Sequence, residues 1–177
     1  MDRAGPTADD SRRLARIFDG HEPRLARLAK SLRGKLRTRL PGLFELVYVY
    51  ERQRALVLSY APTERGSDGI CAISVRPGEV SLCFGRGAEL AKSDPAGLLR
   101  GRGTTMRFIE LRSAAEFERK DVQALVTAAC RLAGLRLDAR VKGPVVFKMP
   151  ARKAPARRAS RPDRNRSSKR RPAAGAG

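Results

Sequence analysis

The N-terminal part of the chain contains two segments in which apolar side chains recur every three or four positions. The first segment carries Leu14, Ile17 and Phe18, with suitable helix caps among residues 9–11. The second begins at Pro23, a residue favoured in a first helical turn, and ends before Pro41-Gly42. The apolar side of this second segment carries Leu25, Leu28, Ala29, Leu32 and Leu36. Its other side carries Arg24, Arg27, Lys30, Arg33 and Arg37. The pattern predicts two N-terminal helices.

Short apolar segments separated by turns follow these helices. In Phe44–Tyr50 the residues Leu46, Tyr48 and Tyr50 alternate onto one face, as in a strand. The further predicted strands are 54–61, 69–75, 80–84 and 106–111. The short links leave no room for crossover helices, so these strands are expected to pair antiparallel. In Arg76-Pro77-Gly78-Glu79 the proline and glycine stand where a type II turn requires them.

The last part of the domain is predicted to be a helix and a loop. Asp94-Pro95 has the pattern of a capped short helical turn before the fifth strand. Ser113 and Glu116 are spaced as a capping box, and Gly134 is placed to end the helix that follows. The apolar residues of that helix are Val122, Leu125, Val126, Ala129 and Ala133. The pattern at 145–149 does not decide between an edge strand and a loop.

The predicted fold class is therefore α+β, with an antiparallel sheet of about five strands. Two N-terminal helices and one C-terminal helix are expected to pack against it. Composition changes abruptly at Pro150, which divides the chain into a domain at 1–150 and a tail at 151–177. The tail has ten basic residues, one acid and no aromatic or β-branched residue. It cannot bury enough apolar surface to offset the entropy of ordering, so it is predicted to be disordered.

The chain is strongly basic, with 38 Lys or Arg against 18 Asp or Glu in 177 residues. Such an excess attracts polyanions, nucleic acid above all. The tail would supply Arg152, Lys153, Arg157, Arg158, Arg161, Arg164, Arg166, Lys169, Arg170 and Arg171. It has no aromatic ring to stack on bases, so binding through it would be non-specific. A merely solubilising tail is an equal alternative.

Catalytic and metal-binding patterns are poorly represented. The chain has three widely spaced cysteines and a single histidine, His21, which disfavours zinc ribbons and disulfide scaffolds. The acidic start of the chain is unlike a signal peptide, and no apolar segment approaches a membrane span. A non-enzymatic cytoplasmic protein with reduced thiols, without cofactor or metal and without membrane association, is expected. The oligomeric state stays open.

Two Gly-Arg-Gly triplets, at 85–87 and 101–103, are candidates for an anion site. Glycine lets successive N–H groups converge on an anion, and an arginine adds a charge-assisted contact. The ligand-binding residues expected on this interpretation are Arg86, Arg102 and Arg107. Neither triplet matches a dinucleotide fingerprint, and ordinary turn geometry is the alternative.

The segment 80–111, with SLCFGRGAEL, DPAGLL and GRGTTMRFIEL, resembles the YdhG-like domain family, whose function is not known. The similarity extends over about 25–133, includes ELVYVYERQRALVLSYA and LVTAA, and leaves the basic tail outside it. It implies a compact α+β domain with an antiparallel sheet. Some members have been likened to frataxin as iron chaperones, which use an acidic helix, whereas the second helix here is basic. No iron ligand is transferred to this chain.

Three functions are therefore carried forward. The first is a small YdhG-like binding module for an anionic ligand or partner. The second is non-specific association with nucleic acid through the tail, aided by the basic second helix. The third is frataxin-like iron chaperoning.

Overall fold

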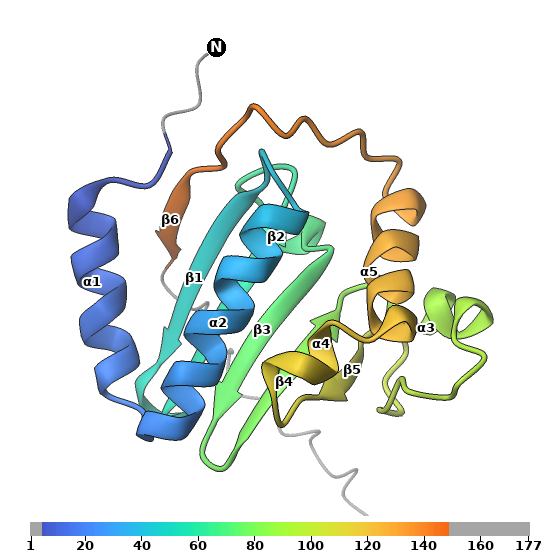
Figure 1. The fold of residues 1–177 in the computed structure, drawn as a ribbon, viewed down its shortest axis with the longest axis horizontal. Coiled ribbons are helices and arrows are strands. Elements are labelled where there is room, and N and C mark those ends of the chain that lie inside the picture. The colour runs from blue at the N-terminus through green and yellow to red at the C-terminus, as the bar shows by residue number, and fades with distance from the viewer. Residues whose placement is uncertain (1–4, 149–177) are drawn as a thin grey trace, which may run out of the picture.

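The computed structural model describes residues 5–148, which form a six-stranded mixed sheet with five α-helices (Figure 1). The helices are α1 (Ala8–Asp19), α2 (Pro23–Arg39), α3 (Gly87–Leu90), α4 (Ala114–Phe117) and α5 (Lys120–Leu132). The strands are β1 (Phe44–Tyr50), β2 (Ala55–Ala61), β3 (Cys71–Arg76), β4 (Glu79–Phe84), β5 (Arg107–Glu110) and β6 (Val145–Lys148). Short 3₁₀ turns are η1 (Glu51–Gln53), η2 (Gly66–Asp68) and η3 (Ala91–Ser93). The predicted α+β class is confirmed.

The strand order is β5-β4-β3-β2-β1-β6. The first five strands pair antiparallel, as predicted, and Gly78 adopts the positive φ of 83° that the β3–β4 turn requires. β6 adds a sixth strand that runs parallel to β1, so the sheet is mixed rather than wholly antiparallel. The parallel direction follows from the long return of the chain through 133–144 after α5, which brings it back to the opposite edge of the sheet (Figure 1).

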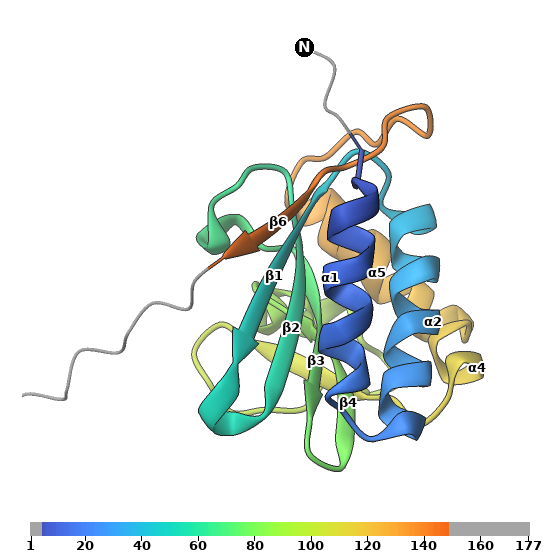
Figure 2. The ribbon, with the colours of Figure 1, turned by 90° about the vertical axis from the view of Figure 1, so that its left-hand side faces the viewer.

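The helices α1, α2, α4 and α5 all cover the same face of the sheet (Figures 1 and 2). α2 packs against β3 and β4, α1 lies beside α2, and α5 contacts α3. The side chains between these layers form one core that includes Leu32, Leu36, Leu58, Ile73, Phe84, Phe117 and Leu125, each at most 2% exposed. Among residues 5–148, no helix is long and apolar enough to cross a bilayer.

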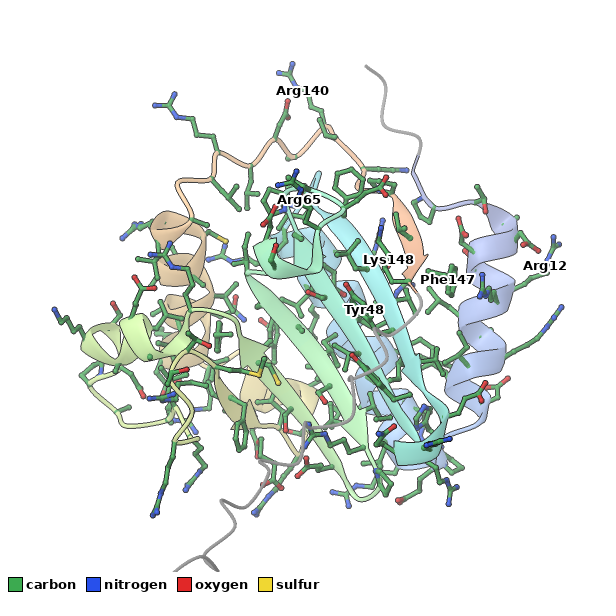
Figure 3. All side chains as sticks on the ribbon, turned by 180° about the vertical axis from the view of Figure 1, so that it is seen from behind. Arg12, Tyr48, Arg65, Arg140, Phe147 and Lys148 are labelled. Atoms are coloured by element: carbon green, nitrogen blue, oxygen red, sulfur yellow. The ribbon has the colours of Figure 1, made fainter. Side chains whose placement is uncertain are left out.

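The other face of the sheet, called here the open face, carries no α-helix of residues 5–148, and the loop that contains η2 lies over part of it, beside Tyr48 and Ser59 (Figure 3). Leu46, Tyr48 and Tyr50 share this face, as their alternation predicts, because Glu45, Val47 and Val49 pair with core residues of β2. The register places the following residues of β2 to β5 on the open face: Val57, Ser59, Ala72, Ser74, Ser81, Cys83 and Phe108.

Three local predictions are altered by the structure. α1 begins one turn earlier than expected, because Thr7 and Asp10 form the capping box, with Asp10 N donating to Thr7 Oγ1 at 3.1 Å. Asp94 caps a turn instead of a helix and accepts hydrogen bonds from the backbone N of Leu98 and Leu99, at 3.0 and 2.7 Å. The single helix expected after Ser113 is divided into α4 and α5.

Glu45 is completely buried between α2 and the sheet, although it carries a charge. Arg33 donates to it through Nε and Nη2, each at 2.8 Å, and Arg37 donates through Nη1 at 2.9 Å. The hydroxyl of Tyr60 donates to Glu45 Oε1 at 3.1 Å. Arg37 also donates to the carbonyl of Gly143 at 2.9 Å, just before β6. This Glu45 cluster therefore joins α2 to β1, β2 and the start of β6.

The charges of the Glu45 cluster explain two pKa shifts. Burial, followed by the charge of Glu45, raises the pKa of Tyr60 well above its usual value. Burial opposes the charge of Arg33, but the hydrogen bond and the negative charge of Glu45 outweigh it and raise the pKa of Arg33. The guanidinium groups of Arg33 and Arg37 thus neutralise a buried carboxylate. They do not extend the basic surface of α2, as the sequence analysis expected them to.

Replacing Glu45 with Gln should destabilise the domain strongly, by ~3–5 kcal/mol, because two partly buried guanidinium groups lose their counter-charge. Tyr60→Phe, which removes one hydrogen bond and leaves the ion pairs, should cost only ~1 kcal/mol. Urea unfolding of the full chain measures both effects, with Glu110→Gln as an exposed control of the same charge change. A loss for Glu45→Gln no larger than that of the control would contradict a structural role for the cluster.

Candidate functional site

Arg86, the first of the three predicted anion-binding arginines, is engaged with its own chain. Its Nε and Nη2 contact the two carboxylate oxygens of Glu89 at 2.7 and 2.6 Å, and its Nη1 donates to the carbonyl of Leu132 at 2.9 Å. The hydrogen bond from Arg86 also lowers the pKa of Glu89. Arg86 therefore connects α3 with the end of α5.

Arg107 and Arg102 lie on and before β5. Arg107 donates through Nη1 to the carbonyls of Gly103 and Met106, at 2.5 and 2.8 Å, and so closes the loop that precedes its own strand. Arg102 is exposed in that loop and makes no side-chain hydrogen bond or ion pair within residues 5–148. Of the three arginines, Arg102 alone makes no side-chain hydrogen bond, and the three guanidinium groups share no hydrogen-bond partner within the described part of the chain.

The glycines of the first triplet allow chain segments to approach closely. A Cβ atom at Gly87 would lie 2.5 Å from the backbone N of Arg107, and one at Gly85 would lie 2.5 Å from the carbonyl oxygen of Gly69. In the second triplet, Gly101 has a φ of 108°, which favours glycine. These positions therefore have a structural reason to be glycine whether or not an anion binds.

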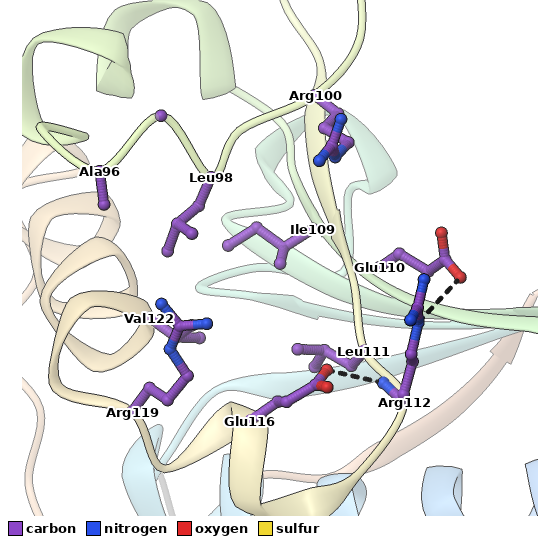
Figure 4. A pocket seen from close by; sticks show the side chains of 11 residues that line it. Ala96, Leu98, Arg100, Ile109, Glu110, Leu111, Arg112, Glu116, Arg119 and Val122 are labelled. Atoms are coloured by element: carbon purple, nitrogen blue, oxygen red, sulfur yellow. Dashed lines mark hydrogen bonds and ion pairs between the residues drawn. The ribbon is translucent and has the colours of Figure 1, made fainter.

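A cleft of about 510 Å³ lies beside β5, at the free edge of the sheet (Figure 4). Its apolar lining is Leu98, Ile109, Leu111 and Val122, which come from the loop after Asp94, from β5 and the residue that follows it, and from α5. Arg100 lies at one end of the cleft, and Arg112 and Arg119 lie towards the other end (Figure 4). The sequence analysis did not identify these three arginines, because they come from separate segments and form no motif.

The three arginines differ in how fully their donors are used. Arg119 is held by Asp121, with Nε to Oδ1 at 3.1 Å and Nη2 to Oδ2 at 2.5 Å. The side chain of Arg112 is exposed, and its Nε lies 4.0 Å from Glu110 Oε1, which is only a loose ion pair. Arg100 makes no side-chain hydrogen bond or ion pair within residues 5–148. Arg100 and Arg112 are therefore the two cleft arginines that can engage an added anion.

The backbone of β5 also contributes to the cleft. Phe108 exchanges backbone hydrogen bonds with Arg100, at 2.8 and 3.0 Å, so its N–H and C=O point away from β4. Backbone groups alternate in direction along a strand, so the N–H of Glu110 points outward in the same way, towards the cleft. The cleft thus combines a strand-edge donor, two available guanidinium groups and an apolar floor, with Glu110 and Glu116 limiting its positive charge.

The histidine and the cysteines lie away from this cleft or inside the core. Burial raises the pKa of the Cys83 thiol to about 11, and burial also raises the pKa of Cys71 and of Cys130. Burial, followed by the charge of Arg54, lowers the pKa of His21, which lies between α1 and α2. No group of three or more His, Cys, Asp or Glu within residues 5–148 is placed to hold a metal ion.

Comparison of the chain with protein-family models, with curated proteins and with solved structures finds no match. Functional inference therefore rests on the residues and geometry described above.

Replacing Gly87 with Ala should destabilise the full chain by ~1–3 kcal/mol, because the new methyl group would overlap the backbone of Arg107. Gly34→Ala is the matched control, since a Cβ atom there meets nothing within 4 Å in the middle of α2. This control should stabilise the protein by ~0.5–1 kcal/mol through helix propensity. Thermal or urea unfolding distinguishes the expected loss of stability in Gly87→Ala from the expected gain in Gly34→Ala. Equal stability of Gly87→Ala and wild type would show that the close approach is not needed.

Proposed function

We propose that the protein is a non-enzymatic binding module for a small anionic ligand, which it holds in the cleft beside β5. The observation that carries this proposal is the pair of available arginines, Arg100 and Arg112, on an apolar floor at a strand edge. The proposal keeps the YdhG-like interpretation of 25–133 and moves the expected anion contact from the glycine triplets to this cleft.

The chemistry of the cleft favours a ligand with one anionic group and an apolar body. Arginine presents a planar fork of donors that matches a carboxylate or a phosphate. The side chains of Leu98, Ile109 and Val122 offer a hydrocarbon or aromatic body a surface to contact. A cleft of about 510 Å³ is within the range that small-molecule sites occupy. The two lining glutamates disfavour a ligand that carries several negative charges.

Binding rather than catalysis is supported by the state of the possible nucleophiles and bases. A thiol reacts as the thiolate, and the raised pKa values of Cys71, Cys83 and Cys130 disfavour that form at neutral pH. His21 is separated from the cleft by its position between α1 and α2. The three cysteines are free thiols, which agrees with our proposal that the protein works in the reducing cytoplasm.

Arg100→Gln and Arg112→Gln should each weaken binding of an arylphosphate, with phenyl phosphate as the probe, by about tenfold or more. The shift of the unfolding temperature of the full chain with phenyl phosphate concentration measures this affinity. Arg102→Gln is the matched control, because it removes the same charge from an exposed arginine two residues further along the same loop as Arg100.

The control should keep the affinity of the wild type. If Arg102→Gln and Arg100→Gln weaken the affinity for phenyl phosphate equally, the anion binds at the glycine triplet or is attracted only by the overall positive charge of the protein. Unchanged affinity of the Arg100 and Arg112 variants would exclude the cleft.

Association with nucleic acid is a second candidate function, and the distribution of charge favours it. Residues 5–148 carry 27 basic and 16 acidic side chains, so the domain is basic in its own right. Arg24 and Arg27 of α2 remain exposed, although Arg33 and Arg37 do not. The ten predicted tail residues lie outside the described residues, and their segment follows Lys148 at the end of β6.

If the tail binds phosphates, the affinity of the full chain for duplex DNA should fall steeply as salt increases, because counterions are released on binding. Deleting 151–177 should make the slope of log K against log salt much shallower. Fluorescence anisotropy of a labelled duplex at several salt concentrations measures both slopes. The same slope with and without the tail would exclude it as the phosphate-binding segment.

A further inference from the structure

The open face carries a strip of small side chains with aromatic rings on both sides. The strand register defines two rows that cross the whole sheet. The first row is Val146, Leu46, Ser59, Ala72, Cys83 and Phe108. The second row is Lys148, Tyr48, Val57, Ser74, Ser81 and Glu110. The centres of both rows, on β3 and β4, are Ala, Ser or Cys, whereas Tyr48 stands on β1, next to the edge strand β6, and Phe108 stands on the edge strand β5.

The aromatic rings at the β1 side are held in place by their neighbours. Tyr48 and Tyr50 stack with ring centroids 6.5 Å apart and planes 21° from parallel. The η2 loop confines the outer end of Tyr48, because a Cβ atom at Gly66 would lie 2.5 Å from its hydroxyl. Phe108 stands four strand spacings away, at about 19 Å. All three rings are half-buried, so part of each ring is accessible to a partner.

Ser81 supplies an independent sign of a missing partner in the middle of the strip. Its side chain belongs to the second row and is only 4% exposed. Its Oγ is the single buried side-chain polar atom within residues 5–148 that lacks a hydrogen-bond partner. Buried hydroxyl groups are nearly always hydrogen-bonded. Because this oxygen has almost no accessible surface, a partner on the strip could hydrogen-bond to it only after the neighbouring side chains move.

The charges around the open face favour an anionic partner. Arg65 on the η2 loop is exposed, and Lys148 lies beside Tyr48 (Figure 3). Lys148 Nζ donates a hydrogen bond to Glu64 Oε2 at 3.2 Å, and Arg76 forms a looser ion pair with Glu79 at 3.9 Å. Residues 5–148 as a whole have an excess of 11 positive charges, and a highly basic segment follows Lys148 in the sequence.

We propose that the open face binds single-stranded nucleic acid. Bases would stack on Tyr48, Tyr50 and Phe108, and phosphates would contact Arg65 and Lys148. Aromatic rings with basic neighbours are the combination by which proteins bind unpaired strands, because every base has a face that can stack. A duplex keeps its bases stacked inside and cannot use these rings.

The proposal adds a base-contacting surface to the nucleic-acid association described as the second candidate function, and it does not involve the cleft beside β5. The two ideas can fail separately. Phosphate binding by the tail depends on charge alone, whereas the open face requires bases. An abasic strand of the same length and charge therefore separates them.

Tyrosine fluorescence provides a direct readout, because the chain has no Trp and only three Tyr. Tyr60 is buried and bonded to Glu45, so a change on binding reports Tyr48 and Tyr50. A single-stranded oligothymidylate should quench the emission of the full-length protein, and the abasic strand should not. Oligothymidylate should also bind about tenfold more tightly than the abasic strand.

Tyr48→Leu should remove most of that preference, and Tyr48→Phe, which keeps the ring, should retain it. Should Tyr48→Leu fail to fold by urea unfolding, Phe108→Leu carries the same test from the other side of the strip. Equal affinity for oligothymidylate and abasic strands, or duplex DNA bound as tightly as the single strand, would overturn the proposal. Quenching that survives in Tyr48→Leu with the wild-type base preference would overturn it as well.

Discussion

The buried carboxylate of Glu45 is the interaction on which the arrangement of this domain depends. It accepts hydrogen bonds from Arg33, Arg37 and Tyr60, and these residues come from α2 and β2. A buried charge is tolerated only when opposite charge and hydrogen bonds surround it, so α2 can occupy essentially one position over the sheet. Through the carbonyl of Gly143, Arg37 extends the same constraint to the segment that leads into β6.

The Glu45 cluster also accounts for the one-sided architecture. α2 packs over β3 and β4, α1 lies beside α2, and α5 packs against α3 and α4, so that α1, α2 and α5 cover the same face (Figure 2). The open face is left with small and aromatic side chains, which is where the nucleic-acid surface is proposed. The cleft arises at the β5 edge, where α4 and α5 meet the sheet. Both proposed sites therefore depend on the same arrangement, in which the helices pack on one face of the sheet.

Much of the local structure was predictable because it depends on neighbours in sequence. Pro23 begins α2, Gly78 makes the β3–β4 turn, and Gly134 ends α5 with a φ of 66°. The alternation of Tyr48 and Tyr50 onto one face was correct. The Thr7 cap, the turn after Asp94 and the direction of β6 were not predicted. Competing local hydrogen bonds decided the Thr7 cap and the turn after Asp94. The long connection between α5 and β6 decided the direction of β6.

The candidate sites were predictable only in part. Arginines in glycine-rich turns suggested an anion site, but Arg86 bonds to the end of α5, 46 residues further along the chain, and Arg107 bonds to the loop just before its own strand. Arg100 and Arg112 line the same cleft only because β5 and the preceding loop fold against α4 and α5.

The sequence by itself therefore determined the five antiparallel strands, the helix ends at Pro23 and Gly134, the α+β class and the excess of positive charge, since these depend on residue type and short-range spacing. The tertiary structure alone decided which arginines form ion pairs with Glu45 and which stay available to bind a ligand, because that depends on contacts between residues far apart in the chain.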